Sequence, residues 1–229
     1  MRRTGLLHVS IAAGIIVIGG CSTPSDEQAA RGVAVGTGGA AANVQSDGEF
    51  VRDLVIMNMA EIELSRAALD KATSADLKAF AQKLIGDHEV AGDKLKSVVL
   101  GHSIEWPAQL DSKHRKTADE LAKKQGAEFD RSYMEAMIEG HQDLAARLES
   151  RLDVRSLADW KTAAAGRTQT QALPEPKAEM RDVQPLPNKS GDELTMKINQ
   201  WAAETYPVAQ KHLDTARALE NATKKRLTS

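Results

Sequence analysis

Residues 49–64 read EFVRDLVIMNMAEIEL, and the spacing of their apolar side chains decides the fold class. Apolar residues recur every three or four positions, as they do on one face of an α-helix. Glu61 falls on that same face, between Phe50, Leu54 and Ala68. The pattern therefore predicts a helix over about residues 49–71 that carries a carboxylate in its apolar face.

Four more segments have helical spacing, at about residues 75–100, 107–124, 128–152 and 192–224. The short turn at residues 73–74 makes the first two helices an antiparallel hairpin. Between residues 162 and 191 lie Pro174, Pro176, Pro185 and Pro187 with few apolar residues, which favours a long surface loop. The sequence thus predicts an all-α fold: an antiparallel four-helix bundle at residues 48–229 with an additional short helix and a long Pro-rich insertion before the last helix.

The N-terminal segment has the layout of a secretory signal peptide over residues 1–20. Its apolar run, residues 5–18, is shorter than the ~20 residues of a membrane-spanning helix. Ile18-Gly19-Gly20-Cys21 resembles the lipobox of bacterial lipoproteins, which implies that Cys21 carries lipid, palmitate included, and that residues 21–47 form a Gly- and Ala-rich tether. Ser22 after the cysteine favours the outer membrane by the same resemblance. The alternative is an ordinary cleaved signal with an incidental thiol.

The net charge and the composition indicate which class of partner and which class of fold to expect. The chain has 30 Lys and Arg against 32 Asp and Glu, and loss of residues 1–20 removes Arg2 and Arg3, leaving 28 − 32 = −4. That charge argues against a nucleic-acid partner. Hydrophobic residues make up 41% of the chain but aromatic residues only 3%, which suits a helical domain.

Four polar side chains fall within the apolar faces of four separate helices: Glu61, His88, His141 and His212, with His141 nearer the edge of its face. Glu61 and His88 lie at similar distances from the hairpin turn, about 5 Å apart in height at 1.5 Å per residue, so they are expected to meet. The insertion leaves the register of His141 and His212 open.

This set of side chains has two interpretations. Imidazole and carboxylate groups bind divalent transition metals, so the four residues could hold Fe, Zn, Mn or Cu. Alternatively they satisfy one another by hydrogen bonds, or bond Tyr133 or Tyr206, without metal. The Glu-x-x-His pattern of di-iron centres is missing, because Ile85, Ile138 and Ala209 stand three positions before the histidines.

Six short stretches of the sequence stand out together. They are Glu49-Phe50-Val51, Glu61-Ile62-Glu63-Leu64, Leu77-Lys78-Ala79-Phe80-Ala81, Asp87-His88, Phe129-Asp130-Arg131-Ser132-Tyr133-Met134 and Tyr206-Pro207-x-x-x-x-His212-Leu213. With these stretches the chain resembles an uncharacterised bacterial ferritin-like family whose members are often labelled predicted outer-membrane proteins. The resemblance covers about residues 49–219 and implies a ferritin-like bundle in the periplasm with Glu61, His88, His141 and His212 at the polar core positions. It implies no established activity.

The sequence contains no phosphate-binding glycine loop, nucleophile elbow or zinc cysteine pattern. The leading expectation is therefore a lipid-anchored periplasmic bundle that acts as a non-enzymatic binding or interaction module with an envelope protein partner. The alternative is a metal-binding protein, redox-active or not, that uses the Glu/His core site. A third possibility is that the Pro-rich loop is itself a recognition segment.

Overall fold

The computed structural model describes residues 46–168 and 184–228. The predicted signal peptide, Cys21 and the tether up to residue 45 lie outside the described residues, as do residues 169–183 of the Pro-rich insertion. The described residues are all-α, as predicted. Their helices are α1 Asp47–Lys71, α2 Ala75–Val98, α3 Ser112–Ala122, α4 Gly126–Glu149, α5 Val154–Thr168 and α6 Glu193–Thr228.

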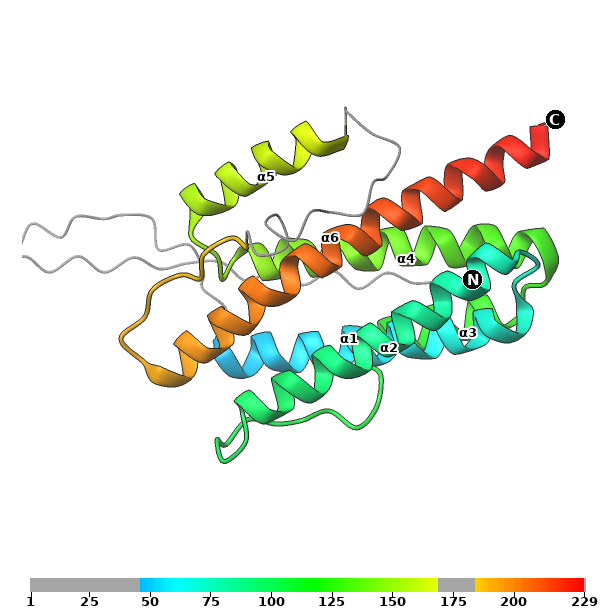
Figure 1. Cartoon of the computed structure of the whole chain (residues 1–229). Helices are drawn as coiled ribbons and strands as arrows, with labels where there is room; N and C mark the ends of the chain where they lie inside the picture. Colours follow the sequence, from blue (N-terminus) through cyan, green and yellow to red (C-terminus); the bar gives the residue numbers. More distant parts are fainter. Residues whose placement is uncertain (1–45, 169–183, 229) are drawn as a thin grey trace, which may run out of the picture. The chain divides into compact units, whose positions relative to one another are not determined.

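Four of these helices form the bundle (Figure 1). Helix α1 packs against α2 and α4, and α6 packs against the same two helices from the other side. Neighbours run antiparallel: Asp47 at the start of α1 pairs with Arg151 just after α4, and His212 of α6 meets Asp87 of α2 while Trp201 meets Ala91. Helices α2 and α4 therefore run in the same direction, and residues 99–125, including α3, cross over between them.

The core has two apolar clusters, one at each end of the bundle. The first gathers side chains from the start of α1, the ends of α2 and α4 and the start of α6, and the second gathers side chains from the opposite halves of these helices. A polar layer separates them. The largest fully buried side chains are Phe50, Leu95, Leu148, Leu152, Ile198 and Tyr206 in the first cluster, and Leu77, Leu84, Phe129, Tyr133, Met134 and Met137 in the second.

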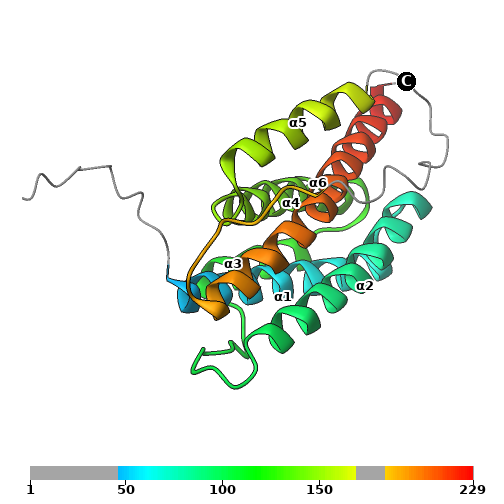
Figure 2. The same cartoon turned by 60° about the vertical axis from the view of Figure 1, so that its left-hand side comes forward.

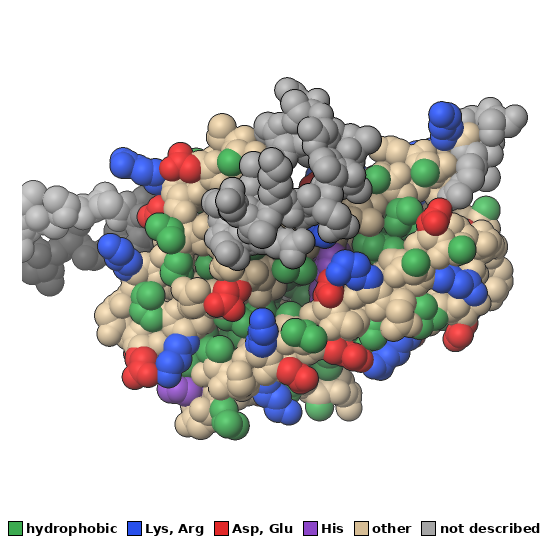
Figure 3. Space-filling view, in the orientation of Figure 1, with side chains coloured by type: hydrophobic (Ala, Val, Ile, Leu, Met, Phe, Trp, Pro, Cys, Tyr) green, Lys and Arg blue, Asp and Glu red, His purple; other side chains and the backbone are tan. Residues whose placement is uncertain are grey.

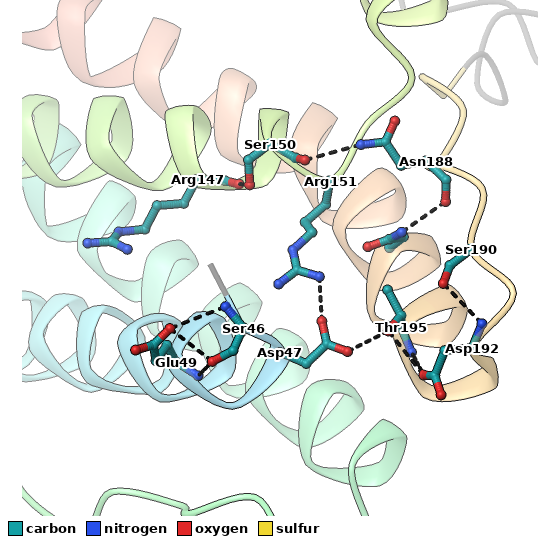
Figure 4. A network of polar contacts seen from close by, with 11 residues as sticks. Ser46, Asp47, Glu49, Arg147, Ser150, Arg151, Asn188, Ser190, Asp192 and Thr195 are labelled. Carbon is teal, nitrogen blue, oxygen red and sulfur yellow. Dashed lines mark hydrogen bonds and ion pairs between the residues drawn. The ribbon is translucent and has the colours of Figure 1, made fainter. Parts of the chain in front are cut away.

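A polar network ties three helix ends together at the first cluster (Figure 4). The carboxylate of Asp47 accepts hydrogen bonds from the guanidinium of Arg151 and, at 2.6 Å, from the hydroxyl of Thr195. Arg151 is only 4% exposed, and its guanidinium lies 4.2 Å from the ring centroid of Phe50. Because Ser46 and Glu49 form a capping box, the first turn of α1 is satisfied at the same place. The network fixes α1, α4 and α6 relative to one another.

Two predicted boundaries need correction. The third helix begins at Ser112 and not at Pro107, because the carboxylate of Asp111 caps it by accepting a hydrogen bond from the backbone N–H of His114 at 2.8 Å. The loop predicted from residue 162 begins later, because residues 162–168 belong to α5. Helix α5 lies outside the bundle beside α4 and α6 (Figures 1 and 2), where the Trp160 ring packs edge-on against Tyr206 at 5.2 Å. None of the described helices is long and apolar enough to cross a membrane.

Candidate metal centre

The four predicted polar residues meet in the layer between the two apolar clusters. Each comes from the middle of a different helix: Glu61 from α1, His88 from α2, His141 from α4 and His212 from α6. Their exposed fractions are 4%, 6%, 0% and 3%. His141, expected near the edge of its helix face, is thus fully buried, because α1 and α6 both pack against α4.

The three imidazole rings face one another. Ring centroids are 5.5 Å apart for His88 and His141, 5.7 Å for His88 and His212, and 5.2 Å for His141 and His212. One ring nitrogen from each histidine lies within 4.8 Å of those from the other two. Nitrogen ligands of a tetrahedral zinc ion lie about 3.4 Å apart, as follows from Zn–N bonds of about 2.0–2.1 Å. Small ring movements would therefore bring the three nitrogens onto one ion.

Glu61 lies beside two of these rings. Its Oε2 atom is 3.0 Å from Nε2 of His88 and 3.2 Å from Nδ1 of His141. These distances are short, yet neither carboxylate oxygen forms a well-directed hydrogen bond with the described residues. The other oxygen, Oε1, occupies the space above Gly140, where an added Cβ atom would stand 2.7 Å from it. The carboxylate therefore has unused acceptor capacity inside the core.

A separate acceptor orients each ring. Nδ1 of His88 faces Oδ1 of Asn58 at 2.9 Å, Nδ1 of His141 faces the carbonyl of Met137 at 2.9 Å, and Nε2 of His212 faces Oδ2 of Asp87 at 2.7 Å. These oxygens only accept, so each facing nitrogen carries the proton. The other nitrogen of each neutral ring then has a free lone pair, the arrangement in which histidine ligates metal.

The charges of the cluster follow from its burial. Burial raises the pKa of the Glu61 carboxyl, but the nearby His141 and His88 outweigh it and lower the pKa overall. Burial lowers the pKa of His141, although Glu61 opposes the shift. Burial also lowers the pKa of His212, to about 4, despite its hydrogen bond to Asp87. At neutral pH the site thus holds a charged Glu61 carboxylate and neutral rings at His141 and His212, the protonation states that metal ligands need.

The tyrosine contacts considered for the alternative without metal do not form. The Tyr133 hydroxyl bonds the Ser65 hydroxyl at 3.0 Å, and the Tyr206 hydroxyl donates to Glu149 at 2.7 Å. The expected meeting of Glu61 and His88 does occur. Asn58, Asp87 and Gly140 were not identified from the sequence. Asp87 and Asn58 did offer a signal, since the first adjoins His88 and the second stands one helical turn before Glu61.

Fold and site together define an all-α bundle with a buried histidine and carboxylate cluster. The chain belongs to the family described as a domain of unknown function (DUF4142), which matches residues 34–180. That match includes Glu61, His88 and His141 and ends before His212.

Comparison with other proteins adds one structural likeness. A solved structure described as CopM in the Cu(II)-bound form has 18% sequence identity and a TM-score of 0.48, and the likeness covers 78% of this chain and 97% of that one. No curated protein matches the chain.

Replacing Gly140 by Ala tests the close packing around Glu61. The new methyl would stand 2.7 Å from Oε1 and force the buried carboxylate to move. Gly86→Ala is the matched control, because nothing lies within 4 Å of its added Cβ in the middle of α2. Ala stabilises a helix by roughly 0.5–1 kcal/mol over Gly, so we expect Gly86→Ala to gain this much and Gly140→Ala to lose about 1–2 kcal/mol instead. Urea unfolding measures both; equal gains would contradict the packing.

The free energy of unfolding of the metal-free protein should fall between pH 7 and pH 5. His212 has its pKa lowered from 6.5 to about 4 in the fold, so the unfolded chain binds more protons in this window and acid favours it. The expected loss from this group is roughly 2 kcal/mol, and His141 acts in the same direction. Urea titrations at both pH values measure it, and His212→Gln should reduce the slope. A wild-type stability that is constant from pH 7 to 5 would contradict the buried neutral state.

Proposed function

We propose that this chain is a metal-binding protein that holds one divalent transition-metal ion through His88, His141 and His212. The proposal rests on one observation: a ring nitrogen from each of these three histidines lies within 4.8 Å of those from the other two. In addition, each ring has one nitrogen hydrogen-bonded to its own oxygen acceptor. Among the described residues, Nε2 of His88 and Nε2 of His141 are buried and have no hydrogen-bond partner, whereas histidines that served only core packing would be expected to have one. Imidazole donors suit Zn, Cu, Fe or Mn, in keeping with the alternative drawn from the sequence.

Glu61 supplies the negative charge of the proposed site. The carboxylate lies against two of the rings, and its Oε2 atom is placed to bind the ion directly or through a water. A divalent ion would remove the cost of keeping this carboxylate in the core, because the ion offsets its charge without further hydrogen bonds. Metal binding is therefore expected to stabilise the fold as well.

We also propose a ferritin-like connectivity and a location in the cell envelope for this chain. Residues 99–125 form one long crossover between two parallel helices, which supports a ferritin-like connectivity. The lipobox pattern supports a lipid anchor at Cys21 and a place on the periplasmic side of the bacterial envelope, with the outer membrane favoured by Ser22. We propose that the metal site works there as a binding module, beside whatever envelope partner the chain contacts.

Metal binding can be tested with the full chain purified without an affinity tag. We expect one Zn²⁺ or Co²⁺ per chain by elemental analysis and calorimetry, and at least a 100-fold loss of affinity in His88→Gln. Asp87→Asn, which weakens the acceptor behind His212 and also removes the surface ion pair with Lys83, should cost about 10- to 100-fold. His114→Gln is the matched control, since His114 bonds Asp111 on the bundle's outer side. A wild-type protein that takes up none of Zn²⁺, Co²⁺, Cu²⁺, Fe²⁺ or Mn²⁺ would refute the proposal.

Lipid attachment can be tested separately by expressing the full chain in bacteria fed a labelled fatty acid. The wild type should incorporate the label and sediment with membranes, because two acyl chains suffice for stable anchoring. Cys21→Ser should incorporate none and leave the membrane fraction. Label retained by the Cys21→Ser protein would show that lipid is attached elsewhere or that the anchor is of another kind.

A further inference from the structure

A cavity of about 440 Å³ opens between α1, α2 and α6 and reaches the histidine cluster. His88, His212 and Glu61 line its buried part, whereas His141 does not line it. The volume lies within the range of small-molecule sites in proteins. The cavity is therefore a route by which a small molecule could reach the proposed ion.

Its walls are mainly apolar and include two indole rings. Trp201 is held in place by donating its indole N–H to the carbonyl of Ala91 at 3.1 Å. Trp106 comes from the segment between α2 and α3, and the ammonium of Lys96 lies 5.8 Å from its ring centroid. Figure 3 shows hydrophobic side chains gathered between charged ones on the face bordered by α2 and α6. The apolar lining residues are Leu54, Val55, Met57, Met59, Ile62, Ala91, Leu95, Trp106, Leu144, Trp201, Val208 and Ala209.

We propose that this cavity binds a small organic ligand with a flat apolar body and an anionic oxygen-donor group that coordinates the metal. This inference rests on the proposed function, because the ion is what would hold the donor group. Three imidazoles fill three positions on the ion. A fourth position is open to a further ligand when Glu61 binds through a water, and a fifth when Glu61 binds directly and the ion expands its coordination. Because His88 and His212 line the cavity, a ligand entering there reaches that position first.

Charge and shape define the ligand class. Imidazole ligands carry no charge, so they leave the two positive charges of the ion in place. The single carboxylate of Glu61 offsets only one of them, so an anionic donor completes the balance. The two tryptophans and the aliphatic side chains offer an apolar wall to the rest of the ligand, and indole rings pack well against flat molecules. Among the other charged lining residues, Asp87 pairs with Lys83 and Glu89 pairs with Arg66. Asp93 and Lys96 are exposed and carry opposite charges, so the attraction for an anion comes from the ion itself.

Two hydroxamates that share one metal-binding group test the cavity directly. Benzohydroxamate and acetohydroxamate present the same pair of oxygens to the ion, but only the former has a ring to bury. Calorimetry on the full chain loaded with Zn²⁺ should show benzohydroxamate binding roughly 10- to 100-fold more tightly, as expected for burying several extra carbon atoms. Equal affinities in a protein with stoichiometric metal would overturn the cavity proposal alone.

A substitution at the exposed edge of the cavity tests whether the preference for benzohydroxamate arises there. Val208 lines the cavity and is 42% exposed, so Val208→Trp should obstruct it at little risk to folding and should abolish the preference for benzohydroxamate while Zn²⁺ affinity stays within about twofold. Val154→Trp is the matched control, because Val154 is 81% exposed at the start of α5 and should keep the preference. A preference retained in Val208→Trp would overturn the proposed location. A wild type without stoichiometric metal would refute the proposed function, and this inference with it.

Discussion

The buried charge of Glu61 is the constraint on which the rest of the bundle depends. Its carboxylate is 4% exposed, lies between two apolar clusters, and has no well-directed hydrogen bond among the described residues. Moving such a group out of water costs several kcal/mol unless opposite charge or donors offset it. Within residues 46–168 and 184–228, the three histidines, or an ion bound to them, are the groups close enough to do so. The polar layer contains one histidine from each of the other three bundle helices beside this carboxylate.

Other side chains around the layer follow from the same constraint. Gly140 has no side chain because Oε1 of Glu61 fills that space. Asp87 and Asn58 sit behind rings because an imidazole turns freely unless its second nitrogen is held. The apolar clusters above and below keep water away and hold the pKa of His141 and His212 low, so both rings stay neutral at pH 7. Packing thus leaves these two rings in the neutral state that the proposed metal site requires.

How much the sequence could predict depended on how the chain connects each pair of residues. The meeting of Glu61 and His88 was predictable because a turn of three residues joins their helices and fixes the register. The approach of His141 to His212 was not, since α5 and the insertion separate them. Helix α5 was not predicted because its apolar pattern is weak: Leu157 and Trp160 are its side chains that pack against the first cluster. Gly140 gave no signal, because the need for a glycine arises from a carboxylate on another helix.

The polar network at the helix ends helps to set the register of α1, α4 and α6, which the loops between these helices do not determine. Asp47, Arg151 and Thr195 meet at one end of the bundle. From that point, Glu61 lies about 14 residues into α1, His141 about 10 residues back along α4 and His212 about 17 residues into α6, or roughly 21, 15 and 26 Å at 1.5 Å per residue. These distances along the helices differ by up to about 11 Å, or two helical turns, so the network sets the register roughly, and helix tilt and side-chain packing complete the alignment. Asn188, near the end of the insertion, belongs to the same network, since its side-chain amide donates to the carbonyl of Ser150 and its own carbonyl accepts from Asn199. The start of α6 is thus tied to the end of α4 close to Arg151.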